Sequence, residues 1–274
     1  MIMKKILFLL FSCIALLQIK AQQYKGNWDA YVVQINHKPA SVVVDLDFGN
    51  SPEAKEKRNV IIVQLNMKRV QPDGMPAGNE IKTLDSIENG LVNSLSSALS
   101  AQYTGRYTRD GKRDFYFYSN DTSNCITHVA TVLQHFSTYT WTVLVNRDDD
   151  LSNYLNVLYP TQKEMERIQN RRMVDALHAK GDQLTAPRKV DHFLFFKTEA
   201  DRKKFAGVVQ DNGFTVENAG KEIGVKDRPY SLHISRTDKV DYNSIDKVSL
   251  YLWELALHYF GKYEGWETFV VGGI

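Results

Sequence analysis

The chain has few of the residues that mark disulfide-rich scaffolds or repetitive proteins, with 2 cysteines, 7 prolines and 16 glycines in 274 residues. So few cysteines exclude a framework of several disulfides and a zinc site built from paired Cys motifs. The low glycine and proline content excludes collagen-like and low-complexity chains. Hydrophobic residues make up 43% and charged residues 24%, as in an ordinary folded protein. The length predicts about two domains.

The first residues follow the pattern of a secretory signal peptide. Lysines near the N-terminus precede an almost entirely apolar run over residues 6–17, and the small residue Ala21 follows. We predict a signal peptide over residues 1–21, with cleavage between Ala21 and Gln22. The apolar run is too short to span a bilayer, which needs about 20 residues. Lipidation at Cys13 is a weaker alternative, because the apolar run continues past it. These features predict a secreted or periplasmic bacterial protein without stable membrane insertion after signal removal.

Removal of the signal peptide changes the charge of the chain. It takes away three lysines and no acidic residue, so Lys and Arg fall from 34 to 31 against 32 Asp and Glu. The predicted mature chain therefore has a formal charge of −1, which gives no general attraction to nucleic acid or to anionic lipid. We predict no nucleic-acid partner. Cys125 is then the only cysteine, so no intramolecular disulfide can form.

Residues 22–159 form the first predicted domain. The sequences at 36–39 and 110–111 are short, polar segments between β-rich runs, and such segments form hairpin turns. From Glu80 to Ala101 apolar residues recur every three or four positions, which predicts a helix with one buried stripe. That stripe comprises Ile81, Leu84, Ile87, Leu91, Leu95 and Leu99. We expect an antiparallel α+β sandwich. Its other elements are strands within 28–47, 59–67, 103–109, 113–118 and 141–145, and helices at 122–136 and 148–159.

Residues 160–274 form the second predicted domain. Thr161 and Glu164 have the spacing of a capping box at a helix start, and Gly181 supplies a left-handed stop after Lys180. The chain then follows the order strand, helix, strand, strand, helix, strand. These elements are expected at 190–197, 199–212, 214–217, 230–236, 241–260 and 263–270. This order is typical of a ferredoxin-like βαββαβ sandwich, so the predicted fold class is α+β with two domains.

The second domain carries the motifs of a known family. They are Gly181-Asp182, Pro187-Arg188-Lys189-Val190-Asp191-His192 followed by Phe193 to Phe196, Gly213-Phe214, and Gly261-Lys262-Tyr263-Glu264-Gly265-Trp266-Glu267. Over about residues 161–271 the chain resembles the RraB (regulator of ribonuclease E activity B) family, whose founding members bind and inhibit ribonuclease E. The resemblance implies a protein-binding module without a catalytic constellation. Those regulators act in the cytoplasm, so in an exported chain we expect the binding module rather than inhibition of ribonuclease E.

The first domain carries a second set of motifs. They are Trp28-Asp29-Ala30-Tyr31, Glu80 with Leu84 and Glu88, Gly105 with Thr108, Gly111-Lys112-Arg113-Asp114-Phe115-Tyr116-Phe117-Tyr118, Tyr154, and Leu158-Tyr159-Pro160. In these motifs the domain resembles the uncharacterised domain-of-unknown-function family 695. This resemblance implies no activity.

One pair of residues is compatible with catalysis. Cys125 and His128 lie three positions apart near the start of the predicted helix 122–136, where a helix dipole lowers the pKa of a thiol. This pair is the basis of our alternative function, a thiol hydrolase. The preferred interpretation packs Cys125 inward, because no orienting acid or oxyanion hole is evident nearby. We therefore predict that the protein is not an enzyme and uses no cofactor.

Two acidic segments have only part of the pattern of a metal site. Residues 45–56 contain the acids of a calcium loop, but Gly49 and Asn50 stand in the wrong order for that loop. We interpret this segment as a strand end followed by a turn. The run of three aspartates at 148–150 is better placed to cap a helix, whose N-terminus stabilises negative charge. We predict no metal site.

An open sheet face in the second domain is the predicted partner surface. Alternation along the strand at 230–236 turns Leu232 and Ile234 toward the helices and leaves every second residue outward. In the neighbouring strand, every second residue from His192 onward forms one set. If this set also faces outward, the sheet presents histidines with apolar neighbours to a partner. The predicted surface comprises His192, His233, Phe196 and Trp266. The alternative is that the first domain or the helix at 161–180 covers this face.

Together these features predict an exported, non-enzymatic binding or regulatory protein whose partner is another protein. A narrower form of this prediction is an inhibitor of an exported nuclease or toxin, by analogy with the RraB regulators. The sequence makes no prediction of the oligomeric state.

Overall fold

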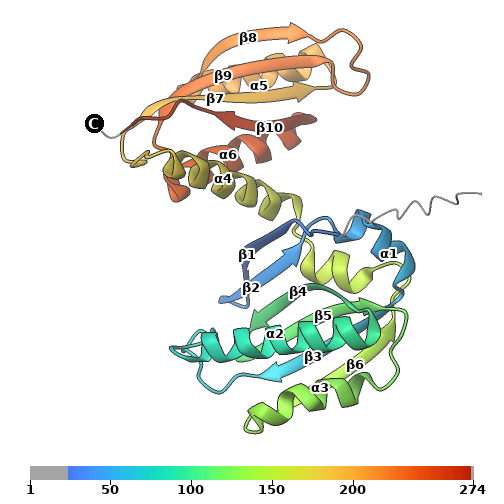
Figure 1. The fold of residues 1–274 in the computed structure, drawn as a ribbon. Coiled ribbons are helices and arrows are strands. Elements are labelled where there is room, and N and C mark those ends of the chain that lie inside the picture. Colours follow the sequence, from blue (N-terminus) through green and yellow to red (C-terminus); the bar gives the residue numbers. More distant parts are fainter. Residues whose placement is uncertain (1–23, 273–274) are drawn as a thin grey trace, which may run out of the picture.

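The computed structural model describes residues 24–272 of the chain. The predicted signal peptide, with its cleavage pair Ala21 and Gln22, lies outside these residues. The described chain contains two antiparallel sheets with helices packed on them, which confirms the α+β fold class. Figure 1 shows the two sheets in separate parts of the molecule, with α4 (Gln162–Ala179) between them.

The N-terminal domain is built on a six-stranded sheet of order β1-β2-β4-β5-β3-β6, in which all neighbours are antiparallel. Its strands are β1 (Trp28–Ile35), β2 (Lys38–Asp45), β3 (Asn59–Asn66), β4 (Gln102–Arg109), β5 (Lys112–Ser119) and β6 (Trp141–Arg147). Both predicted hairpin turns are confirmed. Asn36 and His37 have φ of 49° and 63°. Asp110 and Gly111 have φ of 46° and 78°, and two-residue hairpin loops require such left-handed residues.

Both faces of this sheet are covered. The covering elements are α2 (Glu80–Leu99), α3 (Cys125–Leu133) and η2 (Gln134–Phe136) on one face, and η1 (Phe48–Asn50), α1 (Pro52–Glu56) and η3 (Tyr154–Leu158) on the other. Phe115 of β5 packs in the cluster under α2 and α3, whereas its neighbour Tyr116 packs in the cluster on the opposite face. Strand β5 therefore buries both of its alternate sets of side chains.

Helix α2 turns an apolar stripe toward the sheet, as its spacing predicts. The apolar residues at positions 84, 87, 91, 95 and 99 are all buried. The prediction for Ile81 is wrong, because this side chain is 48% exposed. Glu80 turns inward instead, and its carboxylate accepts a hydrogen bond from the backbone N–H of Lys68 at 2.9 Å. The first turn of α2 therefore places a buried carboxylate beside the end of β3.

The aspartate run after β6 opens a short helical segment, as predicted, and that segment is the π-helix η3. The Asp148 carboxylate accepts hydrogen bonds from the backbone N–H groups of Ser152 and Asn153 at 2.9 and 3.1 Å. It also accepts a hydrogen bond from the Tyr118 hydroxyl. Asp148 therefore caps this segment and anchors it to β5.

The C-terminal domain has a four-stranded antiparallel sheet of order β10-β7-β9-β8. Its elements are β7 (Arg188–Phe196), α5 (Glu199–Asp211), β8 (Thr215–Lys221), β9 (Tyr230–Asp238), α6 (Tyr242–His258) and β10 (Gly261–Glu267). This is the predicted ferredoxin-like βαββαβ arrangement. Phe205 of α5 and Leu252 of α6 pack in one cluster with Leu194 of β7, so both helices cover the same face of the sheet.

Helix α4 precedes this sandwich. Its predicted cap is confirmed, because the Thr161 hydroxyl accepts a hydrogen bond from the backbone N–H of Glu164 at 3.4 Å. After the helix, Gly181 has φ of 89°, the left-handed stop that the sequence predicts. Val174 of α4 packs in a cluster with Ile245 of α6, so α4 lies alongside α6.

Two arginines of α4 also hold the first strand of the N-terminal domain. Asp29 of β1 forms ion pairs with Arg171 and Arg172, and its side chain is only 7% exposed. The Arg171 guanidinium donates a second hydrogen bond, to the carbonyl of Ala30, at 2.6 Å. The junction between the domains is therefore made by α4 and β1.

Candidate binding surface and pockets

The predicted partner residues do not share one face of the C-terminal sheet. His192 and Phe196 lie on β7 and both have 0% exposed surface. His192 pairs across the sheet with Ile234, which faces the helices. Phe193, in contrast, pairs with His233. The prediction that His192 and Phe196 face a partner is therefore wrong, because the outward residues of β7 are the other alternate set.

Trp266 is also buried, with 7% of its surface exposed. Its indole N–H donates to Oδ1 of Asn170 on α4 at 2.8 Å. The side chain packs in a cluster with Val174 of the same helix. The predicted role of Trp266 as a partner residue is wrong, because α4 occupies the position that a partner would need.

His233 lies on the face of the sheet opposite α5 and α6. Its ring stacks on Phe193, with centroids 4.8 Å apart and planes inclined by 20°. Phe195 follows in the same alternate set of β7 and, like Phe193, is partly exposed. None of the described helices packs on this side, so we call it the open face. The open face comprises Lys189, Asp191, Phe193, Phe195, Glu217, Ser231, His233, Ser235, Lys262 and Glu267.

Polar side chains surround the aromatic residues of the open face. The Asp191 carboxylate lies 2.7 Å from Nε2 of His233 and 3.2 Å from the Lys189 ammonium. Glu217 of β8 forms an ion pair with the same lysine at 2.9 Å and accepts a hydrogen bond from the Ser235 hydroxyl at 2.6 Å. This network holds the His233 ring in place. An apolar centre with a polar surround is typical of surfaces that bind proteins.

His192 is a core residue with an unusual polar environment. Its Nδ1 lies 2.8 Å from the Tyr263 hydroxyl, whereas its Nε2 has no hydrogen-bond partner among the described residues. Burial lowers the pKa of His192 to about 3, and the nearby charge of Arg236 acts in the same direction. The imidazole is therefore neutral at neutral pH. Its role is packing under the sheet rather than binding.

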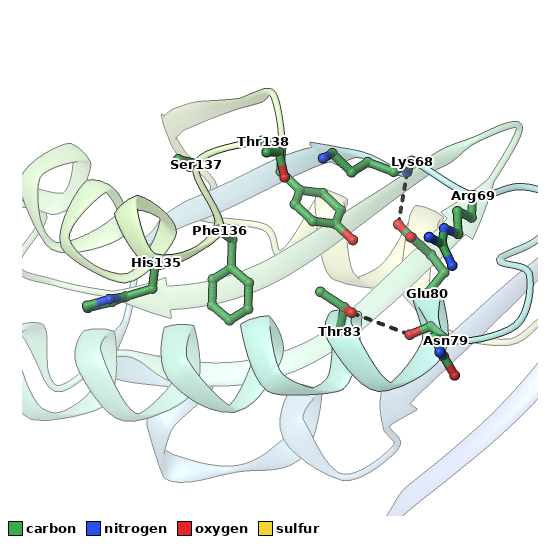
Figure 2. Close-up of a pocket in the computed structure, with 10 residues that line it drawn as sticks. Lys68, Arg69, Asn79, Glu80, Thr83, His135, Phe136, Ser137 and Thr138 are labelled. Atoms are coloured by element: carbon green, nitrogen blue, oxygen red, sulfur yellow. Dashed lines mark hydrogen bonds between the residues drawn. The ribbon is translucent and has the colours of Figure 1, made fainter.

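A separate cavity of about 470 Å³ lies in the N-terminal domain, between the start of α2, the loop after β3 and the segment that precedes β6. Figure 2 shows Lys68, Arg69 and Glu80 on one side of this cavity and His135 and Phe136 on the other. The residues come from three separate segments of the chain. Sequence reasoning missed this cavity, because no local motif joins those segments.

Glu80 and Tyr139 both line this cavity and bring polar groups to it. Burial raises the pKa of Tyr139, and the neighbouring Glu80 carboxylate acts in the same direction, so the phenol stays protonated. The Lys68 ammonium lies 5.2 Å from the centre of the Tyr139 ring. With Arg69 beside it, the rim of the cavity is positively charged. These groups suit a small polar or anionic molecule better than an apolar one.

Cys125 does not have the environment of an activated nucleophile. Its side chain is 4% exposed and packs in the core with Val129, and burial raises the pKa of the thiol. A nucleophilic thiol needs a lowered pKa and a base within hydrogen-bond reach. Within the part of the chain that the structure describes, no hydrogen bond joins Cys125 to His128. The thiol hydrolase alternative gains no support from this geometry.

The acidic segment after β2 is a strand end followed by a turn, as predicted. The Asp45 carboxylate accepts hydrogen bonds from the Tyr24 hydroxyl at 2.6 Å and from the backbone N–H of Asn27 at 2.9 Å. Between residues 24 and 272, the structure places no three His, Cys, Asp or Glu side chains together as a metal site. None of the helices in this range has the length and hydrophobicity needed to cross a membrane.

Comparison with known proteins gives a match for each domain. Residues 26–159 match the model of a family of unknown function (DUF695), and residues 167–268 match the model of Regulator of ribonuclease activity B (RraB). No curated protein matches the chain. A crystal structure of an unknown protein from Galdieria sulphuraria is similar at 8% identity, with 76% of this chain and 97% of that chain covered and a TM-score of 0.23. The chain thus combines a domain that matches the DUF695 family with a following domain that matches the RraB family.

Proposed function

We propose that this chain is an exported regulatory protein that binds another protein through the open face of its C-terminal sheet. The match of residues 167–268 to a family of ribonuclease regulators supports regulation through protein binding. We choose this surface because Phe193 and His233 stack on a sheet face that no helix among the described residues covers. The signal peptide predicted at the N-terminus supports a partner outside the cytoplasm.

The composition of the open face favours a protein partner. Aromatic side chains such as Phe193 and Phe195 provide large contact areas at a small entropy cost, and such residues dominate the energy of protein interfaces. The positive charge of Lys189 is paired with Asp191 and Glu217. The open face therefore does not concentrate the positive charge that attracts a phosphate backbone.

Affinity capture with the mature protein tests this proposal. The wild-type protein should retain a partner at about one-to-one stoichiometry. The double substitution Phe193→Ala and His233→Ala should weaken that retention at least about tenfold, because loss of central aromatic contacts costs more than ~1.4 kcal/mol.

The control for this experiment is Phe260→Ala, which removes a phenylalanine that is 66% exposed elsewhere in the same domain. This variant should retain the partner as the wild type does. Equal retention by the open-face variant, or repeated failure of the wild type to retain any partner, would contradict the proposal.

In the narrower form of the proposal, the partner is an exported nuclease or toxin that this protein inhibits. The support is the match to a family described as regulators of ribonuclease activity. The captured partner should then lose its activity when one equivalent of the protein is added. N-terminal sequencing of the protein recovered outside the cytoplasm should begin at Gln22.

A further inference from the structure

A cavity of about 380 Å³ in the C-terminal domain lies between the first turns of α4, the last turns of α6 and the start of β10. Met165 of α4 and Trp253 and Leu257 of α6 give it an apolar lining. Glu166 projects from α4 into the same lining, beside Tyr263 of β10. The cavity lining thus combines an aromatic and aliphatic wall with one acidic side chain, Glu166, and two basic ones, Arg228 and Lys262.

The charged residues around this cavity differ in whether they have an ion-pair partner. Lys262 forms an ion pair with Glu264, and Arg228 forms one with Asp227. Glu166, in contrast, has no ion-pair partner within the described residues. A partly buried carboxylate without an ion-pair partner is unfavourable, and a cation that pairs with it in the cavity would reduce that cost.

We propose that this cavity binds an arginine or lysine side chain of the protein partner, with its cation beside Glu166. The methylene groups of such a side chain would lie along Trp253 and Leu257, because long basic side chains pack their stems on apolar surfaces. An aromatic wall also favours a cation over a neutral group. This inference depends on one part of the proposed function, namely that the partner is a protein.

The environment of Glu166 also predicts how binding depends on pH. Burial raises the pKa of Glu166 to about 7, the charge of Glu264 acts in the same direction, and Lys262 opposes both. The other charged or titratable groups of the lining are the protonated Tyr263 and Arg228, which is paired with Asp227; α4 adds the neutral amide of Gln162, and α6 adds only uncharged side chains to the lining. A basic ligand keeps its charge, so its affinity should rise as Glu166 ionises, roughly 100-fold between about pH 5 and pH 8.

The probe for this site is N-acetyl-L-arginine amide, whose only charge is on its side chain. Titration into the wild-type protein should shift the NMR signal of the Trp253 indole, with a Kd of roughly millimolar order for one side-chain contact. N-acetyl-L-citrulline amide has nearly the same shape without the charge, and it should cause no comparable shift. Absence of binding by the arginine probe, or equal binding by the citrulline probe, would overturn the inference.

The matched variants are Glu166→Gln and Glu254→Gln. Glu166→Gln keeps the shape of the side chain and should weaken binding of the arginine probe at least about tenfold. Glu254 lies on α6, is paired with Lys163 and is not part of the cavity lining, so Glu254→Gln should bind as the wild type does. Unchanged binding by Glu166→Gln would overturn the inference. The open-face variant of the capture experiment does not alter the cavity lining, so either proposal can fail while the other stands.

Discussion

The two sheets of this molecule differ in how many of their faces are covered. In the N-terminal sheet, the consecutive residues Phe115 and Tyr116 of β5 are 0% and 4% exposed, because helices or loops pack on both sides. In the C-terminal sheet, Phe196 of β7 is fully buried, whereas its neighbour Phe195 is partly exposed. Two similar strands therefore have different roles. The first fills a core on both sides, and the second has one side left for a partner.

The largest effect on stability is expected from a comparison of two phenylalanines of the same strand. Phe196→Ala should reduce the free energy of unfolding by about 3 to 5 kcal/mol, because it opens a cavity in a packed core. Phe193→Ala should cost less than about 1 kcal/mol, since the side chain is already in contact with solvent. Urea unfolding of both variants measures the two values. A loss at Phe193 as large as the loss at Phe196 would mean that the open face is covered in solution.

A comparable effect, present only in acid, follows from the burial of His192 on the covered side of the sheet. Its pKa is about 3 in the folded protein, below the ordinary value of 6.5. The unfolded chain therefore binds a proton that the folded chain does not, and stability falls as pH decreases from about 6.5 toward 3. The loss from this residue should reach about 4 kcal/mol at the acidic end.

His192→Gln removes this titration, so the free energy of unfolding should fall less steeply with acid than in the wild type. The control is His37→Asn, in the exposed turn between β1 and β2, where asparagine tolerates the left-handed backbone. Urea unfolding at a series of pH values measures the slopes. An equal slope in wild type and His192→Gln would show that His192 is not buried as a neutral group.

Much of the fold could be predicted from the sequence because its signals are local. The capping box at Thr161, the left-handed Gly181 and the Asp110-Gly111 turn each depend on residues a few positions apart. The order of strands and helices after α4 was sufficient to predict the ferredoxin-like domain. The exposure of Ile81 shows a limit of periodicity as a predictor. Glu80 takes the inward position because its carboxylate accepts a hydrogen bond from the backbone N–H of Lys68, just after β3.

The partner surface could be predicted only in part. In β9, Leu232 and Ile234 alternate with polar residues, so the outward position of His233 could be inferred. In β7, both alternate sets are apolar, because Leu194 and Phe196 alternate with Phe193 and Phe195. Periodicity alone cannot choose between two apolar sets. The choice is made by pairing with β9, which is a contact between residues about 40 positions apart.

The most direct test of the central claim is a chemical footprint of the histidines in the captured complex. Diethylpyrocarbonate should modify His233 and His37 in the free protein and should leave the buried His192 unmodified. When the partner is bound, modification of His233 should fall several-fold while modification of His37 stays the same. Equal modification of His233 in the free protein and in the complex would contradict the claim that the partner binds the open face.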